Sequence, residues 1–301
     1  MKRDCLTIFD FSDKEIESLL KRAVELKAGA DAGKCPLIGK SIGLFFEKPS
    51  TRTRVSFEVG VYQLGAQPIY LSPKDIQLGR GETIADTART LSRYLNGMVM
   101  RVFRQTSVEE FARYASVPVI NGLSDLHHPC QALADLMTVV ERKGHLEGIR
   151  FAFIGDGNNV ANSLIESAAR TGFDFIIASP QGYGPDPAII DRSRREGKGS
   201  ITVTNDPREA ATGADVLYTD VWVSMGQEAE AAEKAAKFSG YQINSEMLRL
   251  AKDDAIVLHC LPAYRGKEIT DEVIDGPRSA VFDQAENRLH TEKALLEFLV
   301  R

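Results

Sequence analysis

The chain has 301 residues, of which 43% are hydrophobic and 26% are charged, a globular composition that is long enough for two domains. Its formal net charge of −5 and pI of about 5.7 argue against a general nucleic-acid-binding protein and make a local basic cluster more informative. The sequence has no apolar run of membrane-spanning length and no signal-peptide core. We therefore expect a cytoplasmic protein with no membrane partner.

The four cysteines lie far apart, at Cys5, Cys35, Cys130 and Cys260, without a C-x-x-C pair. This usage is typical of reduced thiols in a cytosolic protein. It favours neither a disulfide framework nor a zinc site.

In the first half of the chain, strand and helix patterns alternate. A capping box at 12–15 opens a helix that we expect to end near Lys27. A second capping box, Ser107 to Glu110, predicts the start of a helix that reaches Tyr114. In chain order, strands are expected over 41–46, 67–71, 98–103 and 117–120, and the other helices over 55–64, over 84–95 and from Pro129.

The same alternation restarts after Gly144. It predicts an α/β fold of two domains, each a parallel sheet flanked by helices. The first domain is expected over 1–134 and the second over 148–284, with a last helix at 285–301 that packs back onto the first domain. The strands expected in the second domain are 149–154, 173–178, 201–204, 216–220 and 255–259, and one of its helices is expected over 227–237.

A cluster of hydroxyls and arginines follows the strand at 41–46 and a turn at Pro49. The N-terminus of a helix has unpaired N–H groups that suit an anion, and guanidinium groups match the geometry of phosphate. We therefore predict a phosphate cradle. The alternative is a polar helix cap with solvated arginines. The cluster consists of Ser50, Thr51, Arg52, Thr53 and Arg54.

Other polar residues also follow predicted strands, where open α/β sheets bind their ligands. In the first half these are Arg101, His128 and Gln131, which suit a phosphate or a carbonyl group. In the second half they fall in 156–159, 220–226 and 259–262. Those segments offer carboxylate, amide, hydroxyl and thiol groups, which suit an amino-acid substrate.

Two of these segments have other readings. Gly155-Asp156-Gly157 after a strand resembles the start of a dinucleotide fingerprint, but Val160 occupies the third glycine position. Cys260 beside His259 suggests a Cys–His nucleophile. Adjacent strand residues point to opposite faces, which argues against that pair.

Six motifs in the same order resemble those of the aspartate/ornithine carbamoyltransferase family, and they cover essentially the whole chain. Each motif alone is weak, but the set is specific. The D-x-x-x-S-M-G and H-C-L-P motifs resemble the ornithine branch of the family. The motifs are S-T-R-T-R at 50–54, H-P-C-Q at 128–131, G-D-G-N-N at 155–159, D-V-W-V-S-M-G at 220–226, H-C-L-P at 259–262 and A-E-N-R at 285–288.

The resemblance implies an active site in an interdomain cleft. It also implies transfer of the carbamoyl group of carbamoyl phosphate to the δ-amine of L-ornithine, giving L-citrulline and phosphate without a metal or cofactor. Arg101 and His128 would polarise the carbamoyl oxygen, and Gln77 would reach the phosphate site of a neighbouring subunit. The residues implied to bind carbamoyl phosphate are Ser50, Thr51, Arg52, Thr53, Gln77, Arg101, His128, Gln131 and Arg288.

For the acceptor, the resemblance implies that Cys260 lies beside the δ-amine and orients it, rather than acting as a covalent nucleophile. We expect the loop at 224–226 to move over ornithine as the domains close. The residues implied to bind ornithine are Asn159, Asp220, Ser224, Met225, Cys260 and Leu261.

The family's basic assembly is a catalytic trimer, so we expect a homotrimer or a multiple of it, with no nucleic-acid partner. Citrulline formation for arginine biosynthesis and the reverse reaction in catabolism are both compatible with the motifs. The sequence leaves two alternative functions. One is a carbamoyltransferase for putrescine or N-acetylornithine, and the other is a non-catalytic Rossmann-type protein that binds an anion or a dinucleotide.

Overall fold

The structure, a computed structural model, describes residues 2–31, 33–74, 76, 81–223 and 231–300. It divides into two compact units. Unit 1 comprises Met1–Met137 and Glu286–Arg301, and unit 2 comprises Thr138–Ala285. Within the described ranges, unit 1 has a four-stranded sheet and unit 2 a five-stranded sheet, and every pair of neighbouring strands is parallel. The predicted α/β class is therefore confirmed.

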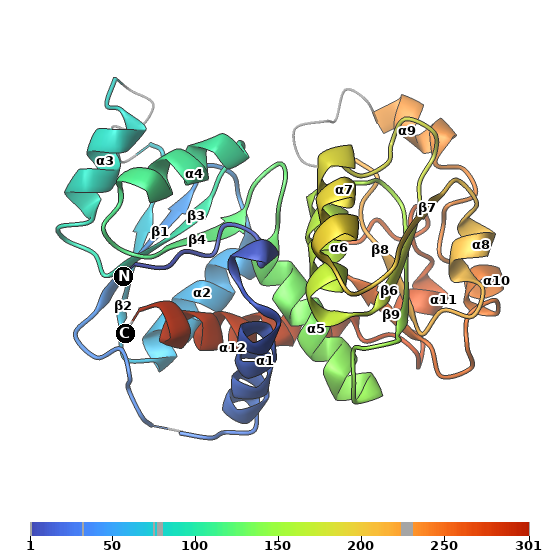
Figure 1. Cartoon of the computed structure of the whole chain (residues 1–301), viewed down its shortest axis with the longest axis horizontal. Helices are drawn as coiled ribbons and strands as arrows, with labels where there is room; N and C mark the ends of the chain where they lie inside the picture. The colour runs from blue at the N-terminus through green and yellow to red at the C-terminus, as the bar shows by residue number, and fades with distance from the viewer. Residues whose placement is uncertain (1, 32, 75, 77–80, 224–230, 301) are drawn as a thin grey trace. The chain divides into compact units, whose positions relative to one another are not determined.

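The sheet of unit 1 has the strand order β2-β1-β3-β4. Figure 1 shows α3 and α4 over one face of this sheet and α2 and α12 over the other. Near-continuous apolar runs form the central strands, as expected for strands covered on both faces. The elements are η1 (Ile8–Asp10), α1 (Asp13–Lys27), β1 (Ser41–Phe46), α2 (Thr51–Gln63), β2 (Gln67–Leu71), α3 (Ile84–Leu91), β3 (Gly97–Arg101), α4 (Gln105–Tyr114) and β4 (Val119–Leu123). Two further helices, α5 (Pro129–Lys143) and α12 (Val281–Leu299), contribute residues to both units.

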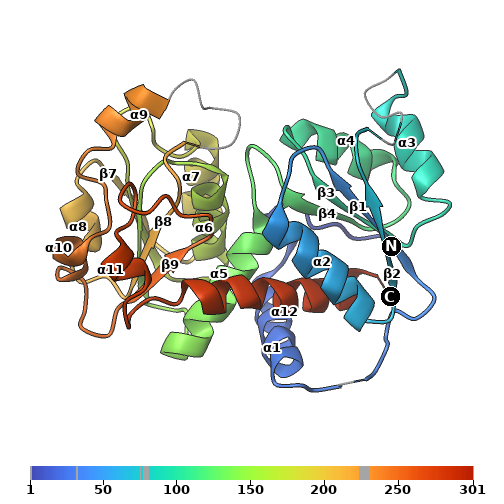
Figure 2. The same cartoon turned by 180° about the vertical axis from the view of Figure 1, so that it is seen from behind.

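The sheet of unit 2 has the strand order β7-β6-β5-β8-β9. Its α6 and α7 cover one face, and α8, α10 and α11 cover the other (Figures 1 and 2). The elements are β5 (Arg150–Ile154), α6 (Asn159–Thr171), β6 (Asp174–Ala178), α7 (Pro187–Glu196), β7 (Ile201–Thr204), α8 (Pro207–Ala211), β8 (Val216–Thr219), α9 (Ala231–Lys237), α10 (Ser245–Leu248), β9 (Ile256–His259) and α11 (Asp271–Ile274).

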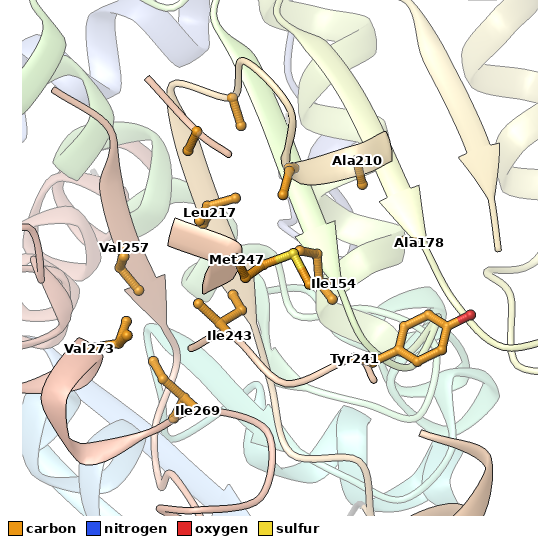
Figure 3. Close-up of a cluster of buried hydrophobic side chains, with 14 of the residues drawn as sticks. Ile154, Ala178, Ala210, Leu217, Tyr241, Ile243, Met247, Val257, Ile269 and Val273 are labelled. Carbon is orange, nitrogen blue, oxygen red and sulfur yellow. The ribbon is translucent and has the colours of Figure 1, made fainter. Parts of the chain in front are cut away.

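Each sheet buries its own apolar core. In unit 1, Phe45 and Met100 of the sheet pack with Phe111 of α4. In unit 2, Leu217 and Val257 lie in one cluster with residues of α8, α10 and α11, as Figure 3 shows. These cores fix the sheets, and the loops at the carboxyl ends of the strands are then held in place.

The last helix, α12, lies along α2 in unit 1 (Figure 2). Lys293 of α12 donates to Gln63 of α2 at 3.0 Å. Arg22 of α1 pairs with Glu297 of α12 at 2.7 Å. Residues 286–301 therefore belong to unit 1 by contact, although they lie far along the chain from its other residues.

Three predicted helix starts were wrong. The last helix, expected from 285, begins at Val281. The helix expected from 55 begins at Thr51, where Ser50 Oγ accepts from Thr53 N at 3.2 Å. The helix expected from Ser107 begins at Gln105. Its first N–H donates to Asp125 Oδ1 at 2.8 Å, so a carboxylate from a distant loop caps this helix in place of the local box.

Within the described residues, no helix combines the length and the apolarity needed to cross a membrane.

Candidate active site

The predicted phosphate cradle lies at the N-terminus of α2, directly after β1. Because α2 begins at Thr51, the N–H groups of its first turn belong to the motif itself, and they carry the partial positive charge of the helix end. Thr53 is buried, Arg52 is half-buried and Thr51 is exposed. Backbone donors, hydroxyls and a guanidinium group are thus gathered within one turn.

Strand register brings Arg101 to the same edge of the sheet. Phe46 of β1 is paired with Arg101 of β3, and Arg101 is paired with Leu123 of β4. The register between β3 and β4 shifts at Met100/Arg101, an irregularity that is frequent beside functional sites. Arg101 is only 6% exposed, so its charge is held inside unit 1.

The backbone carbonyl of His128 accepts the first N–H bonds of α5, from Gln131 N at 3.1 Å and Ala132 N at 3.2 Å. The ring is 5% exposed. Burial first, and then the charges of Arg288, Arg101, Lys48 and Arg52, hold the pKa of His128 well below its usual 6.5. The imidazole is therefore neutral at pH 7, and four cations surround a group that still has an N–H to donate.

Arg288 joins α12 to this group of cations. Its NH1 donates to Gln131 Oε1 at 2.8 Å, and its NH2 donates to Thr53 Oγ1 at 3.1 Å. Gln131 in turn donates to Asp135 Oδ1 at 2.8 Å. These side chains from α2, α5 and α12 lie in one buried network. We call Arg52, Arg101 and Arg288, together with the uncharged His128 and Gln131 beside them, the cationic cluster.

Arg54, in contrast, is not part of the cradle. Its Nε donates to Glu58 at 2.9 Å, and its guanidinium carbon lies 3.7 Å from the centre of the Tyr70 ring. The side chain is 44% exposed. The interpretation of two cradle cations was therefore wrong for Arg54, because a residue two positions after Arg52 on a helix does not share its face.

In unit 2, Asp220 and Cys260 follow neighbouring strands. Thr219 of β8 is paired with His259 of β9, so the next residue of each strand lies at the carboxyl edge. Cys260 Sγ donates to Asp220 Oδ1 at 2.9 Å, and Asn158 Nδ2 donates to Asp220 Oδ2 at 2.7 Å. Asp220 is 7% exposed, so these donors hold a buried carboxylate in a fixed position.

His259 holds the turn after β9. Its Nδ1 accepts from Leu261 N at 2.8 Å, so the ring proton is on Nε2, which lies 3.2 Å from Glu268 Oε1. Both side chains are fully buried. Leu261 has a φ of 56° and forms a cis peptide bond with Pro262. The backbone position of Cys260 and Leu261 is thus set from the core of unit 2.

The glycine motif after β5 packs closely against the backbone at 184–185. A Cβ on Gly157 would lie 2.1 Å from Pro185 N, so the lack of a side chain serves a close approach within unit 2. Asp156 pairs with Lys234 of α9 at 2.7 Å. Asn158 caps α6, and Asn159 is its first residue. These contacts argue against the dinucleotide reading.

One potential metal-ligand set occurs in the part of the chain that the structure describes. Asp220, His259 and Cys260 each offer a ligand atom, and these atoms lie within 4.8 Å of one another. In this structure they take part in hydrogen bonds with Asn158, Glu268 and each other. The buried carboxylate of Asp220, with the Cys260 thiol beside it, is the part of this set that could attract an amine.

Three predicted residues, Gln77, Ser224 and Met225, lie outside the described residues. Two others were missed. Lys48 faces the cationic cluster, and burial, followed by the charge of Arg101, lowers its pKa. Glu292 pairs with Arg288 at 2.7 Å. Its position four residues after an arginine on a helix was the available signal.

Comparison with known proteins gives matches over both halves of the chain. Residues 3–141 match the family model described as aspartate/ornithine carbamoyltransferase, carbamoyl-P binding domain. Residues 147–299 match the model described as aspartate/ornithine carbamoyltransferase, Asp/Orn binding domain.

Individual relatives are similar over their full length. A protein of Syntrophus aciditrophicus (strain SB) named ornithine carbamoyltransferase is 54% identical over 302 residues, covering 100% of each chain. The structure of ornithine carbamoyltransferase from Pyrococcus furiosus is 50% identical, with a TM-score of 0.95 over 99% of this chain and 97% of that chain. That of the anabolic ornithine carbamoyltransferase from Campylobacter jejuni is 43% identical, with a TM-score of 0.93 over 99% and 98%.

Proposed function

The chain belongs to the aspartate/ornithine carbamoyltransferase family, and we propose that it transfers the carbamoyl group of carbamoyl phosphate to the δ-amine of L-ornithine, releasing L-citrulline and phosphate. The relatives named above favour ornithine over putrescine or N-acetylornithine as the acceptor. The observation that carries the proposal is a neutral His128 held among the charges of Arg52, Arg101 and Arg288. These four side chains suit a substrate that carries both a negative charge and a carbonyl group.

In this proposal, unit 1 holds the donor. Ser50, Thr51, Arg52 and Thr53 bind the phosphate through hydroxyls, the guanidinium group and the helix end. Gln77 reaches the phosphate of a neighbouring subunit. The domain that performs this role is residues 1–134 together with 285–301, and residues 148–284 form the ornithine-binding domain.

The carbamoyl end then meets Arg101, His128, Gln131 and Arg288. Attack on the carbonyl carbon moves negative charge onto its oxygen, so donors fixed in advance are most effective in the transition state. A neutral His128 donates one N–H without adding a further charge to the cationic cluster. Loss of one such donor typically slows the reaction by about 10²–10³.

The acceptor contacts are Asn159, Asp220, Ser224, Met225, Cys260 and Leu261. An amine of this type has a pKa of ~10.4 and must lose a proton before attack, which at neutral pH costs roughly 4–5 kcal/mol. Asp220 attracts the amine, and Cys260 orients it. The δ-nitrogen forms the new C–N bond, the bond from carbon to the phosphate oxygen breaks, and phosphate leaves as hydrogen phosphate with the proton that the nitrogen gives up.

We further propose that the protein is a cytoplasmic homotrimer and that it forms citrulline for arginine biosynthesis. The similarity to an enzyme described as anabolic supports that direction. The proposed role of Gln77 across a subunit interface makes an isolated subunit defective, so dilution to monomers would abolish activity.

The test measures the carbamoylated product and the phosphate released from carbamoyl phosphate with ornithine, putrescine and N-acetylornithine in separate reactions. We expect turnover with ornithine alone and its loss in Arg101→Leu. Turnover with another acceptor would refute the assigned specificity, and no turnover with any acceptor would refute the carbamoyltransferase function.

A further inference from the structure

Glu292 is a carboxylate of α12 that is 1% exposed. It lies one helical turn after Arg288. Its Oε1 accepts from Arg288 Nε at 3.0 Å and from Arg288 NH2 at 2.7 Å. Burying a charge is costly unless the charge is paired and hydrogen-bonded. The two residues therefore allow each other to remain inside unit 1.

Arg288 donates four hydrogen bonds to other side chains of unit 1. A guanidinium group has five N–H donors in a rigid fork. Two donate to Glu292, one on NH1 donates to Gln131, and one on NH2 donates to Thr53. Among the residues that the structure describes, this leaves one N–H, on NH1, without a protein partner. Arg288 is 3% exposed, so that donor is held away from bulk water.

We propose that Glu292 is a positioning residue for carbamoyl transfer, which fixes the Arg288 guanidinium so that its remaining NH1 hydrogen is available to carbamoyl phosphate. The inference rests on the proposed function, because it takes carbamoyl phosphate as the ligand of Arg288. Glu292 touches no substrate in this scheme. It acts through Arg288, and through Arg288 on the carbonyl oxygen of Gln131 and the hydroxyl of Thr53.

The charges around Glu292 support this role. Burial raises the pKa of Glu292 to about 7, although Arg288 on α12 and the hydroxyl of Ser56 on α2 lower it. From α5, the thiol of Cys130 faces the same carboxylate, and its pKa is raised by burial first and then by Glu292. Burial alone would lower the pKa of Arg288, but its neighbours, with Glu292 the largest, raise it. The guanidinium group is therefore charged throughout the pH range of an assay.

Three substitutions of Glu292 separate the effect of its side-chain position from the effect of its negative charge. Glu292→Ala removes the acceptor, Glu292→Gln keeps an acceptor oxygen without the charge, and Glu292→Asp keeps the charge on a shorter side chain. Glu297→Ala is the matched control. It breaks a second Arg–Glu pair of α12, with Arg22 at 2.7 Å, outside the cationic cluster.

The dissociation constant for carbamoyl phosphate is measured by titration calorimetry in the cold without ornithine, and citrulline formation is assayed separately. We expect Glu292→Ala and Glu292→Asp to weaken binding by about tenfold or more, and Glu292→Gln to stay within about threefold of the unsubstituted chain. Glu297→Ala is expected to lower Tm and leave binding unchanged. The double variant Arg288→Gln/Glu292→Ala should bind no worse than Arg288→Gln alone, because a positioning residue has no effect once its target is removed.

The inference is overturned if Glu292→Asp binds as well as the unsubstituted chain, if Glu297→Ala weakens binding equally, or if the double variant shows additive losses. Glu292→Asp and Glu292→Gln preserve most of the volume, so the test does not depend on whether Glu292→Ala folds. Failure of the unsubstituted chain to form citrulline would instead refute the proposed function. If the unsubstituted chain forms citrulline and the Glu292 variants bind carbamoyl phosphate as tightly as it does, only the role of Glu292 is refuted.

Discussion

Cys260 Sγ lies 2.9 Å from Asp220 Oδ1, so a thiol and a carboxylate from neighbouring parallel strands act as one polar group. Asn158 holds the other oxygen of Asp220. Of Asp220 and Cys260, only Asp220 is a carboxylate. The proposed attraction for the acceptor amine therefore depends on the negative charge of Asp220.

Asp220→Asn is expected to raise KM for ornithine by about 10–100-fold, because a charge-assisted hydrogen bond contributes roughly 1.5–3 kcal/mol. KM for carbamoyl phosphate should change little. Cys260→Ser, which keeps a donor, is expected to retain measurable turnover, whereas a covalent nucleophile would lose it. Steady-state kinetics with each substrate varied in turn checks both results. Complete inactivity of Cys260→Ser would contradict the orienting role.

Activity is expected to rise with pH. Below its pKa, the deprotonated fraction of the acceptor amine increases about tenfold for each pH unit. His128 contributes no opposing step near neutrality, because its depressed pKa keeps the ring neutral there. The measurement is kcat/KM for ornithine between about pH 6.5 and 9 with saturating carbamoyl phosphate. A flat profile would show that amine deprotonation does not limit the reaction.

Glu292 is expected to make stability depend on pH. Its folded pKa is about 7, above the usual 4.5, so the folded state holds the proton more tightly than the unfolded chain. The contribution of this group is complete below pH 4.5 and is lost as pH rises through 7. At roughly 1.4 kcal/mol per pH unit, the loss is about 3 kcal/mol.

Urea unfolding of the unsubstituted chain and of Glu292→Gln at both ends of that range checks this dependence. The stability of the unsubstituted chain relative to Glu292→Gln should fall as pH rises. A constant difference would mean that Glu292 titrates normally in the folded protein.

The Asp156–Lys234 pair is expected to matter for ornithine. Lys234 is 3% exposed and lies three residues after Ala231, where the described chain resumes. On the other side of that segment, Trp222 stacks on Phe238 with ring centres 5.6 Å apart. Lys234→Ala leaves Asp156 without this buried partner, and we expect KM for ornithine to rise by about tenfold.

The matched control for Lys234→Ala is Lys252→Ala. Lys252 pairs with Asp215 at 2.8 Å, but its side chain is 50% exposed, so its loss should have little effect on either KM. Equal changes in the two variants would show a general loss of stability in unit 2.

Gly157→Ala is expected to destabilise unit 2 by about 1–3 kcal/mol or more, because its Cβ would overlap the backbone at 184–185. Gly184→Ala is the control from the same contact, since a Cβ there meets nothing within 4 Å. Thermal unfolding of the two variants measures the difference. Equal Tm values would mean that the 184–185 backbone moves aside at no cost.

The sequence was sufficient to predict the two parallel sheets and the polar residues that follow their strands. Asp220 and Cys260 do follow β8 and β9, because apolar runs mark strands reliably when both faces are buried. The partners in space were not predictable. Asp125 caps α4 from 20 residues away, and Glu292 reads as an ordinary helix-surface acid until α12 is placed against α2 and α5. Long-range packing, which local periodicity does not encode, decides both.

The placement of α12 in unit 1 has a consequence for the order in which the protein is made. Arg288 is synthesised long after Thr53 and Gln131, to which it donates hydrogen bonds. The first 137 residues, once synthesised, therefore lack one cation of the cationic cluster. A chain that stops before Arg288 cannot complete the cluster, so the proposed donor half of the site becomes whole only after residue 288 has been synthesised.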